Sequence, residues 1–282
     1  MNTSSTDNWD TIIKPKQSLF KLNLIEVWRY KDLLFMMIRR DFVTYYKQTI
    51  LGPIWFFIQP LLTTSTFTLI LGVVAGLSTD DKPMFLFYMA GITLWNYFAD
   101  CLYKTSTTFK DNENIFGKVY FPRIIVPISI IISNLIKFGI QYALFIIILI
   151  FHCINGDVMP TFLVIITPLL ILLMAALSLG LGMIVTSLTT KYRDLYFLIQ
   201  FGVQLLMYGS SVIIPISSAP EKYIFLLKLN PIVPIIESFK SIYLGGLVDW
   251  SGLAYSTIVT TFILLLGIII FNKTEKNVMD TI

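Results

Sequence analysis

The sequence predicts an all-α integral membrane protein with six transmembrane helices, an N-terminal amphipathic helix in the membrane interface and a re-entrant helical hairpin between spans 5 and 6. Hydrophobic residues make up 56% of the 282 residues and charged residues only 13%, whereas soluble domains are about a quarter charged. Apolar runs of the length that crosses a bilayer recur along the chain. One further apolar stretch is interrupted too often to cross.

Residues 1–53 form the predicted cytoplasmic N-terminal region. Residues 1–18 are polar and lack the apolar core of a signal peptide, so we expect the first span to target the chain. From Leu19 to Lys31 apolar residues and a tryptophan alternate with basic residues, which is typical of a helix lying in the interface. A second helical stretch covers 33–46. These helices either anchor the chain or act as a lever on the first span, and composition favours neither.

Six apolar runs make up the predicted transmembrane domain, residues 54–272, and 273–282 form a cytoplasmic tail. Gly52-Pro53 marks the start of the first run, and a charged segment at 191–194 separates the fourth from the fifth. Each run is long enough to cross with some tilt. The predicted spans are residues 54–77, 84–103, 126–151, 161–188, 195–216 and 253–271.

The lysines and arginines predict the orientation. Eight lie in 1–53, four in 104–123, two in 191–193 and two in 273–276, which places sixteen on one side. The other side has four, namely Lys82, Lys222, Lys228 and Lys240, and Lys137 lies inside the third span. Cytoplasmic loops are enriched in basic residues, so both termini are predicted to be cytoplasmic.

The loop between spans 2 and 3, residues 104–125, is charged but carries several apolar residues. Such residues on a cytoplasmic loop either rest on lipid headgroups or fit a groove on a partner protein. Asp111 and Glu113 would be repelled by anionic headgroups, which favours the partner.

Residues 217–246 form the predicted external hairpin. The apolar runs 223–229 and 232–236 are short and are separated by Asn230-Pro231 and Pro234. Broken backbone at membrane depth is tolerated where protein or a water-filled cavity shelters it. The segment is therefore expected to enter the membrane and return to the same side, at the mouth of a conduit.

The chain offers little for catalysis. A phosphate-binding loop of the form G-x-x-x-x-G-K-[ST] is missing, and His152 is the only histidine. We therefore expect no cofactor or metal on this chain. Asp100 and Lys137 are ionisable groups inside predicted spans, and matching depths favour a structural ion pair.

Spans 1 and 5 are rich in uncharged polar residues, and aromatic residues reach 15%. Such residues either join helices through hydrogen bonds and form interface belts, or line a path for a hydrophilic substrate. Sugar rings have apolar C–H faces that suit aromatic surfaces. The candidate pore-lining residues are Trp55, Gln59, Thr63, Tyr97, Gln204 and Tyr208.

Three segments resemble one family of transporters. They are RRDFVTYYKQTILGPIWFFIQPLL at 39–62, KVYFPRIIVP at 118–127, and 191–246, which begins KYRDLYFLIQ and ends FKSIYLGG. Together they resemble the permease subunit of ABC-2-type polysaccharide exporters, in the O-antigen and lipid-linked polysaccharide branch. The resemblance extends from about Leu19 to Phe271.

The resemblance implies a bacterial inner-membrane homodimer that works with two copies of a separate ABC ATPase, which would bind ATP and magnesium. The complex would export an undecaprenyl-linked polysaccharide. The loop residues expected at the ATPase are Phe109, Phe116, Tyr120, Phe121, Pro122 and Arg123. The gating region before span 1 would include Arg39, Arg40, Tyr46, Lys47 and Gln48. The external gate would include Pro220, Tyr223, Asn230, Pro231, Pro234 and Glu237.

Three positions depart from the family pattern: Ser211 stands where proline is common, Lys240 where arginine is common, and Tyr45 where a basic residue is common. Two other functions stay open at this point. One is an ABC-2-type exporter of a smaller substrate, such as a lipid, a drug or a teichoic acid. The other is a membrane enzyme that modifies glycans or lipids, although such an enzyme would need clustered Asp, Glu or His residues at one membrane face.

Overall fold

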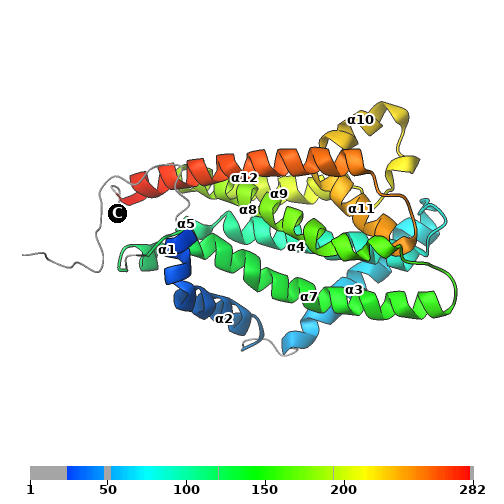
Figure 1. Cartoon of the computed structure of the whole chain (residues 1–282), viewed down its shortest axis with the longest axis horizontal. Coiled ribbons are helices and arrows are strands. Elements are labelled where there is room, and N and C mark those ends of the chain that lie inside the picture. Colours follow the sequence, from blue (N-terminus) through cyan, green and yellow to red (C-terminus); the bar gives the residue numbers. More distant parts are fainter. Residues whose placement is uncertain (1–23, 48–51, 120, 193, 280–282) are drawn as a thin grey trace, which may run out of the picture.

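The computed structural model describes residues 24–47, 52–119, 121–192 and 194–279, and within them it has helices and no strands. Long helices lie side by side along the long axis of the molecule (Figure 1). They are α4 (Met84–Thr105), α7 (Ile125–Ile154), α8 (Thr167–Lys191) and α12 (Trp250–Met279). Helix α3 (Trp55–Phe67) continues as a π-helix, Thr68–Val74, and lies along the outside of α4 and α7.

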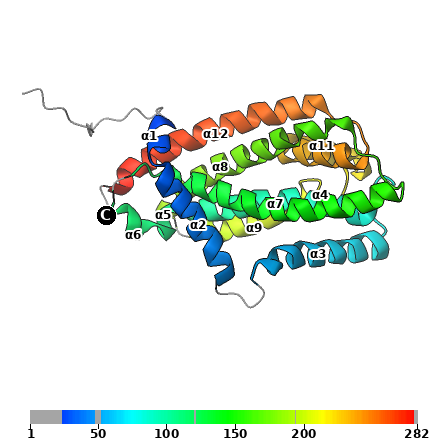
Figure 2. The same cartoon turned by 60° about the horizontal axis from the view of Figure 1, so that its bottom comes forward.

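The shorter elements gather at the two ends of this bundle (Figures 1 and 2). At one end, named here the basic end, lie α1 (Leu24–Arg29), α5 (Thr108–Asp111), α6 (Glu113–Phe116) and the last turns of α12. At the other, the hairpin end, lie α10 (Glu221–Leu229) and α11 (Ile232–Leu244), together with the connections 75–83 and 155–161. Helix α2 (Lys31–Lys47) packs along α7 and agrees with the helix predicted over 33–46.

Four helical segments within the described residues are long and apolar enough to cross a membrane. They are Trp55–Val74, Ile125–Ile154, Phe162–Lys191 and Trp250–Lys276, and they correspond to predicted spans 1, 3, 4 and 6. Helix α4, at predicted span 2, is less apolar because it contains Asn96 and Asp100. It is instead the most enclosed of the long helices, with Leu86, Tyr88 and Phe98 fully buried.

The prediction for span 5 was wrong at its C-terminal end. Helix α9 (Leu195–Tyr208) stops at Tyr208, where residues 195–216 had been expected to be continuous. Fourteen residues rise about 21 Å, which is less than the ~30 Å hydrocarbon core. Gly209 is the C-cap of the helix, and Ser211, two residues further on, adopts φ +56°, so the helix does not resume.

Of the two hairpin helices, α11 is buried in the core and α10 lies on the surface. It packs on α4, α8 and α12, and its apolar residues Ile235, Ile236 and Phe239 are fully buried. Helix α10 has no buried residue. The two helices are joined at Asn230-Pro231. Pro231 is the N-cap of α11, with φ −65° already close to helical, and its missing N–H is tolerated there because the first N–H groups of a helix have no partner within it.

Glycines allow α8 to approach two neighbours closely. A Cβ on Gly180 would lie 2.7 Å from Cα of Leu264, and one on Gly267 would lie 2.4 Å from the carbonyl oxygen of Gly180. On the other side of α8, a Cβ on Gly182 would lie 2.5 Å from the side chain of Thr105. Small residues of this kind let membrane helices pack backbone to backbone.

Candidate functional site

The turn that follows α9 is held by side chains of the α10–α11 hairpin. The amide Nδ2 of Asn230 donates to the carbonyl oxygen of Gly209 at 2.9 Å and to Oγ of Ser210 at 3.1 Å. The ammonium of Lys240 donates to the carbonyl oxygen of Ser211 at 2.5 Å and to that of Val212 at 3.3 Å. These four hydrogen bonds join the turn after α9 to the α10–α11 connection, through Asn230, and to α11, through Lys240. We name residues 209–212 with Asn230 and Lys240 the hairpin clamp.

Lys240 is buried, although the sequence places it among the basic residues of the external side. Its side chain is 3% exposed, and its ammonium lies 3.5 Å from the ring centroid of Phe87 in α4. Gly91, one turn further along α4, makes room for it, since a Cβ there would lie 3.2 Å from Cε of Lys240 and 3.1 Å from the carbonyl oxygen of Val212. The hairpin clamp therefore packs against α4, at Phe87 and Gly91.

Ser211 ties the same turn to Glu237 of α11. Its hydroxyl donates to the Glu237 carboxylate and lies 3.1 Å from the carbonyl oxygen of Ile214. The positive φ of Ser211 places that hydroxyl toward α11, and proline could not adopt this conformation because its ring fixes φ near −65°. Of the predicted gate residues, Asn230 and Glu237 thus make specific contacts, whereas Pro220, just before α10, and Tyr223 within it are exposed.

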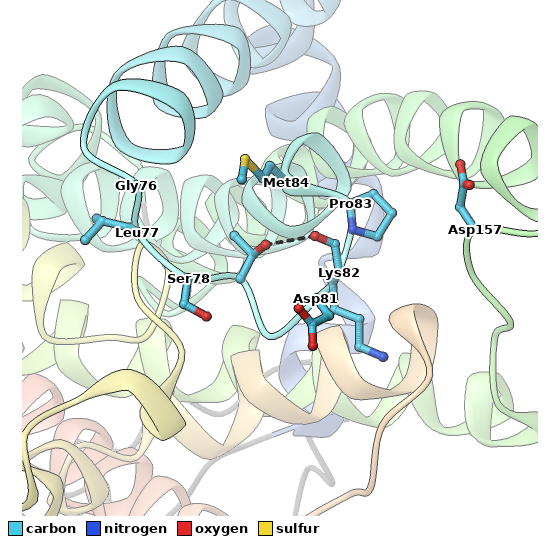
Figure 3. Close-up of a pocket in the computed structure, with 9 residues that line it drawn as sticks. Gly76, Leu77, Ser78, Asp81, Lys82, Pro83, Met84 and Asp157 are labelled. Carbon is cyan, nitrogen blue, oxygen red and sulfur yellow. Dashed lines mark hydrogen bonds between the residues drawn. The ribbon is translucent and has the colours of Figure 1, made fainter.

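The connection 75–83 supports the hairpin from the other side. Asp80 accepts hydrogen bonds at 2.7 Å from the hydroxyl of Ser217, and the ammonium of Lys82 donates to the carbonyl oxygen of Gly245 at 2.7 Å. Asp80 and Asp81 both have positive φ, and Thr79 closes the turn through the carbonyl oxygen of Lys82 (Figure 3). A cavity of about 630 Å³ lies at this turn, between the end of the π-helix and the start of α4.

Asp100 and Lys137 are joined within the helix bundle. The Lys137 ammonium lies 2.5 Å from Oδ2 of Asp100, and the two side chains are 14% and 30% exposed. The ammonium also lies 6.0 Å from the ring centroid of Phe56, so the pair links α4, α7 and α3. A half-buried pair of this kind fixes the relative position of helices and offers no chain of proton carriers.

The candidate pore-lining residues fall into two groups. Tyr97 is 2% exposed and packs on Phe138 at 5.3 Å between ring centroids, so it belongs to the core. The other five lie on the surfaces of α3 and α9, partly or largely exposed; they are Trp55, Gln59, Thr63, Gln204 and Tyr208. These two helices therefore present a mixed aromatic and polar surface outside the bundle.

At the basic end, the three phenylalanines of the loop 104–125 face inward. Phe109 stacks on Phe271 of α12, with 4.7 Å between the ring centroids, and the ring centroids of Phe116 and Phe121 are 5.7 Å apart. The guanidinium of Arg123 lies 5.2 Å from the Phe116 ring and donates to the carbonyl oxygen of Glu275 at 3.0 Å. We name these residues the aromatic cluster.

The burial of the aromatic cluster leaves other loop residues on the surface. Phe109, Phe116, Phe121 and Arg123 are at most 5% exposed, and Pro122 is half-buried. Tyr120 lies outside the described residues. The exposed positions are polar or small apart from one valine; they are Lys110, Asp111, Glu113, Asn114, Gly117, Lys118 and Val119.

The predicted gating region before span 1 lies on α2. Arg39 is exposed, Arg40 pairs with the neighbouring Asp41 at 2.9 Å, and Lys47 is exposed at the end of the helix. The opposite face buries Met37. Tyr46 lies in the same helix, with its side chain outside the described part, and Gln48 lies outside it altogether.

Sequence reasoning missed two features of this site. Lys240 was read as a lysine near the membrane surface, although a lysine in a largely apolar segment, 232–244, is a signal for a buried, partnered charge. Phe271 was read as the end of an apolar span, and its position carries no signal for its partner Phe109. Among the described residues, no group of three or more His, Cys, Asp or Glu side chains could hold a metal ion.

The fold and these contacts define a polytopic helical membrane protein with a clamped hairpin at one end and a packed loop at the other. Residues 32–244 match the family model described as ABC-2 type transporter. The chain belongs to this family.

Its relatives include the O-antigen export system permease protein RfbA of Myxococcus xanthus, 26% identical over 77% of this chain and 82% of the relative. RfbA of Klebsiella pneumoniae is 25% identical over 86% of this chain and 92% of its own length. The polysialic acid transport protein KpsM of Escherichia coli is 22% identical over 86% of this chain and 93% of its own length.

Proposed function

We propose that the chain is the membrane-spanning permease subunit of an ATP-driven ABC transporter that exports a lipid-linked polysaccharide, similar to an O-antigen, across the bacterial inner membrane. The match to the ABC-2 family over 32–244 carries this proposal. The names of the relatives support a polysaccharide as the substrate, because they are permeases for O-antigen and a transport protein for polysialic acid.

In the proposed arrangement, six segments cross the membrane and the hairpin 217–246 re-enters it from the outside. The excess of basic residues at the basic end supports a cytoplasmic position for that end and for both termini. Helix α9 would reach across together with the turn 209–216, which the hairpin clamp shelters. Two copies of the chain would form the channel, with the exposed polar and aromatic residues of α3 and α9 along the path.

Energy would come from two copies of a separate ATPase subunit that binds ATP and magnesium. The exposed residues of the loop 104–125 would contact the ATPase, and the aromatic cluster would transmit the movement to α12 through Phe109 and Phe271. Helix α7 begins where the loop 104–125 ends. Because α2 packs on α7, helix α2 would move with the loop. At the outer end the clamp would hold α9 and the hairpin together as one unit.

The ATPase surface is testable by reversing the charge of an exposed lysine. Lys118→Glu should reduce the amount of ATPase that co-purifies with the permease, whereas Lys222→Glu, the same change on α10 at the hairpin end, should leave it unchanged. Equal co-purification of both variants would overturn this assignment of the loop.

Deletion of the gene tests the function itself. Surface polysaccharide should disappear and its lipid-linked form should accumulate inside the cell, and the intact gene should restore export. Unchanged surface polysaccharide would contradict the proposal and would favour an exporter of a smaller substrate.

A further inference from the structure

A second cavity lies at the hairpin end, on the side of α11 where α12 begins. It measures about 410 Å³ and is enclosed by α10, α11, the connection 245–249 and the first turns of α12. Glu237, Ser238 and Ser241 line it from one face of α11, since residues three and four apart share a helix face. A volume of this size falls within the usual range of small-ligand pockets, about 300–1,000 Å³.

The lining combines apolar residues, Ile216, Pro234 and Leu247, with several polar and charged ones. Besides Glu237 and the two serines it includes Lys228, Asp249 and Tyr255. Ser238 is only 2% exposed, and its buried Oγ has no hydrogen-bond partner within the described part of the chain. A buried hydroxyl without a partner costs free energy.

The charged groups are held in place by the protein. Asp249 accepts hydrogen bonds from Oγ of Ser251 at 2.6 Å and from N–H of Gly252 at 3.0 Å, and these two donors hold the pKa of Asp249 below its usual value. Glu237 is fixed by Ser211 of the clamp. Each carboxylate keeps further lone pairs for a ligand, because an ionised carboxylate accepts about four hydrogen bonds.

Tyr255 completes the wall with its ring. Its hydroxyl donates to the carbonyl oxygen of Leu229 at 2.8 Å, which fixes the ring against the end of α10. Lys228, one residue earlier in α10, contributes an ammonium whose charge acts on Asp249. The cavity thus combines hydrogen-bond acceptors, donors and an aromatic surface.

The charge balance selects the class of ligand. The lining has two carboxylates and the Lys228 ammonium, and the buried Lys240 ammonium also acts on Glu237, so the charges nearly balance and none is left over to select a phosphate or another ion. A neutral sugar fits the set, because its hydroxyls both donate to carboxylates and accept from lysine and serine. We propose that this cavity binds one neutral sugar residue of the exported glycan at the outer end of the permease.

The proposal rests on the proposed polysaccharide export and adds a place where the glycan is held. Because Glu237 lines the cavity and also accepts the hydrogen bond from Ser211, a bound sugar would contact the same carboxylate that ties the hairpin to the end of α9. The glycan and the hairpin clamp would therefore share one residue.

Cysteine protection in cells tests the site with the glycan that the cell itself makes. In a Cys153→Ser background, which leaves only the buried Cys101, Ser241→Cys reports on the cavity and Asn155→Cys serves as an exposed control in the α7–α8 connection. The full chain is expressed with its ATPase and labelled from outside with a membrane-impermeant maleimide. Labelling rates are compared with glycan synthesis active and with its first lipid-linked step blocked.

We expect active synthesis to slow labelling at position 241 about fivefold, which corresponds to a glycan concentration of about four times the dissociation constant. Labelling at position 155 should not change. Adding Asp249→Asn should remove most of the protection, and normal labelling at position 155 in that variant would verify that it is inserted.

Equal labelling at position 241 in both conditions, in cells that export glycan normally, would overturn the sugar site and leave the proposed function intact. Protection that follows added divalent cations rather than glycan synthesis would also overturn it. If deletion of the gene leaves surface polysaccharide unchanged, the proposed function itself fails, and that result is independent of the labelling rates.

Discussion

Replacing Lys240 by methionine removes the centre of the hairpin clamp while keeping an unbranched side chain in the space. The carbonyl oxygens of Ser211 and Val212 lose their donor, and the contact with the Phe87 ring loses its charge. Each buried carbonyl left without a donor costs about 1–3 kcal/mol, and the desolvated cation–π contact contributes about 2 kcal/mol.

Part of this loss is offset, because the folded protein no longer has to bury an ammonium group. That desolvation penalty is several kcal/mol, so we expect a net loss of about 2–4 kcal/mol in the free energy that keeps the turn 209–214 closed. Amide hydrogen exchange of this segment, measured on the full-length protein in lipid nanodiscs, reports that opening directly. Exchange should accelerate roughly 30- to 700-fold.

Lys222→Met is the matched control. It makes the same chemical change on the same hairpin, at a lysine that is exposed on α10. Its exchange should equal that of the wild type. If Lys240→Met exchanges as slowly as Lys222→Met, the clamp does not stabilise the end of α9 and the reasoning is refuted.

Three further substitutions test the packing of the bundle. Gly267→Ala should destabilise the protein by about 1–3 kcal/mol because its Cβ meets the backbone of α8. Gly139→Ala is the control and should be neutral or slightly stabilising, since a Cβ there would have no atom within 4 Å. Equal thermal stability of the two variants would contradict the close contact between α8 and α12. Phe271→Ala should cost about 3–5 kcal/mol, since the ring is fully buried and stacked, and a variant as stable as the wild type in denaturant would disprove that packing. Lys137→Met should cost about 1–3 kcal/mol and adding Asp100→Asn should restore part of it; a strictly additive double variant would show that the ion pair contributes nothing.

The sequence predicts the helical class and most of the long helices because these follow from apolar runs and breakers. It fails for α9, because the turn after Tyr208 depends on partners from the hairpin rather than on local composition. Gly209 and Ser210-Ser211 are turn residues that could have marked the break, yet they stand inside an otherwise apolar run.

For the site, the sequence identifies the right segments but misplaces individual side chains. Phe109, Phe116 and Phe121 are apolar residues on a charged loop, which suggested a surface for a partner, but α12 returns to the same end of the bundle and covers them. The direction of a side chain on a short helix depends on what packs against it. Asp100 and Lys137 were paired on depth alone, and the structure joins them at 2.5 Å.

The central proposal is that this chain, with an ATPase, moves a lipid-linked glycan across a membrane. Proteoliposomes that contain the purified permease and ATPase, with radiolabelled lipid-linked glycan in the outer leaflet, test it directly. With ATP and magnesium the glycan should become protected from an added glycosidase, and without ATP or without the permease it should stay accessible. Glycan that stays fully accessible while ATP is hydrolysed by the complex would contradict the account.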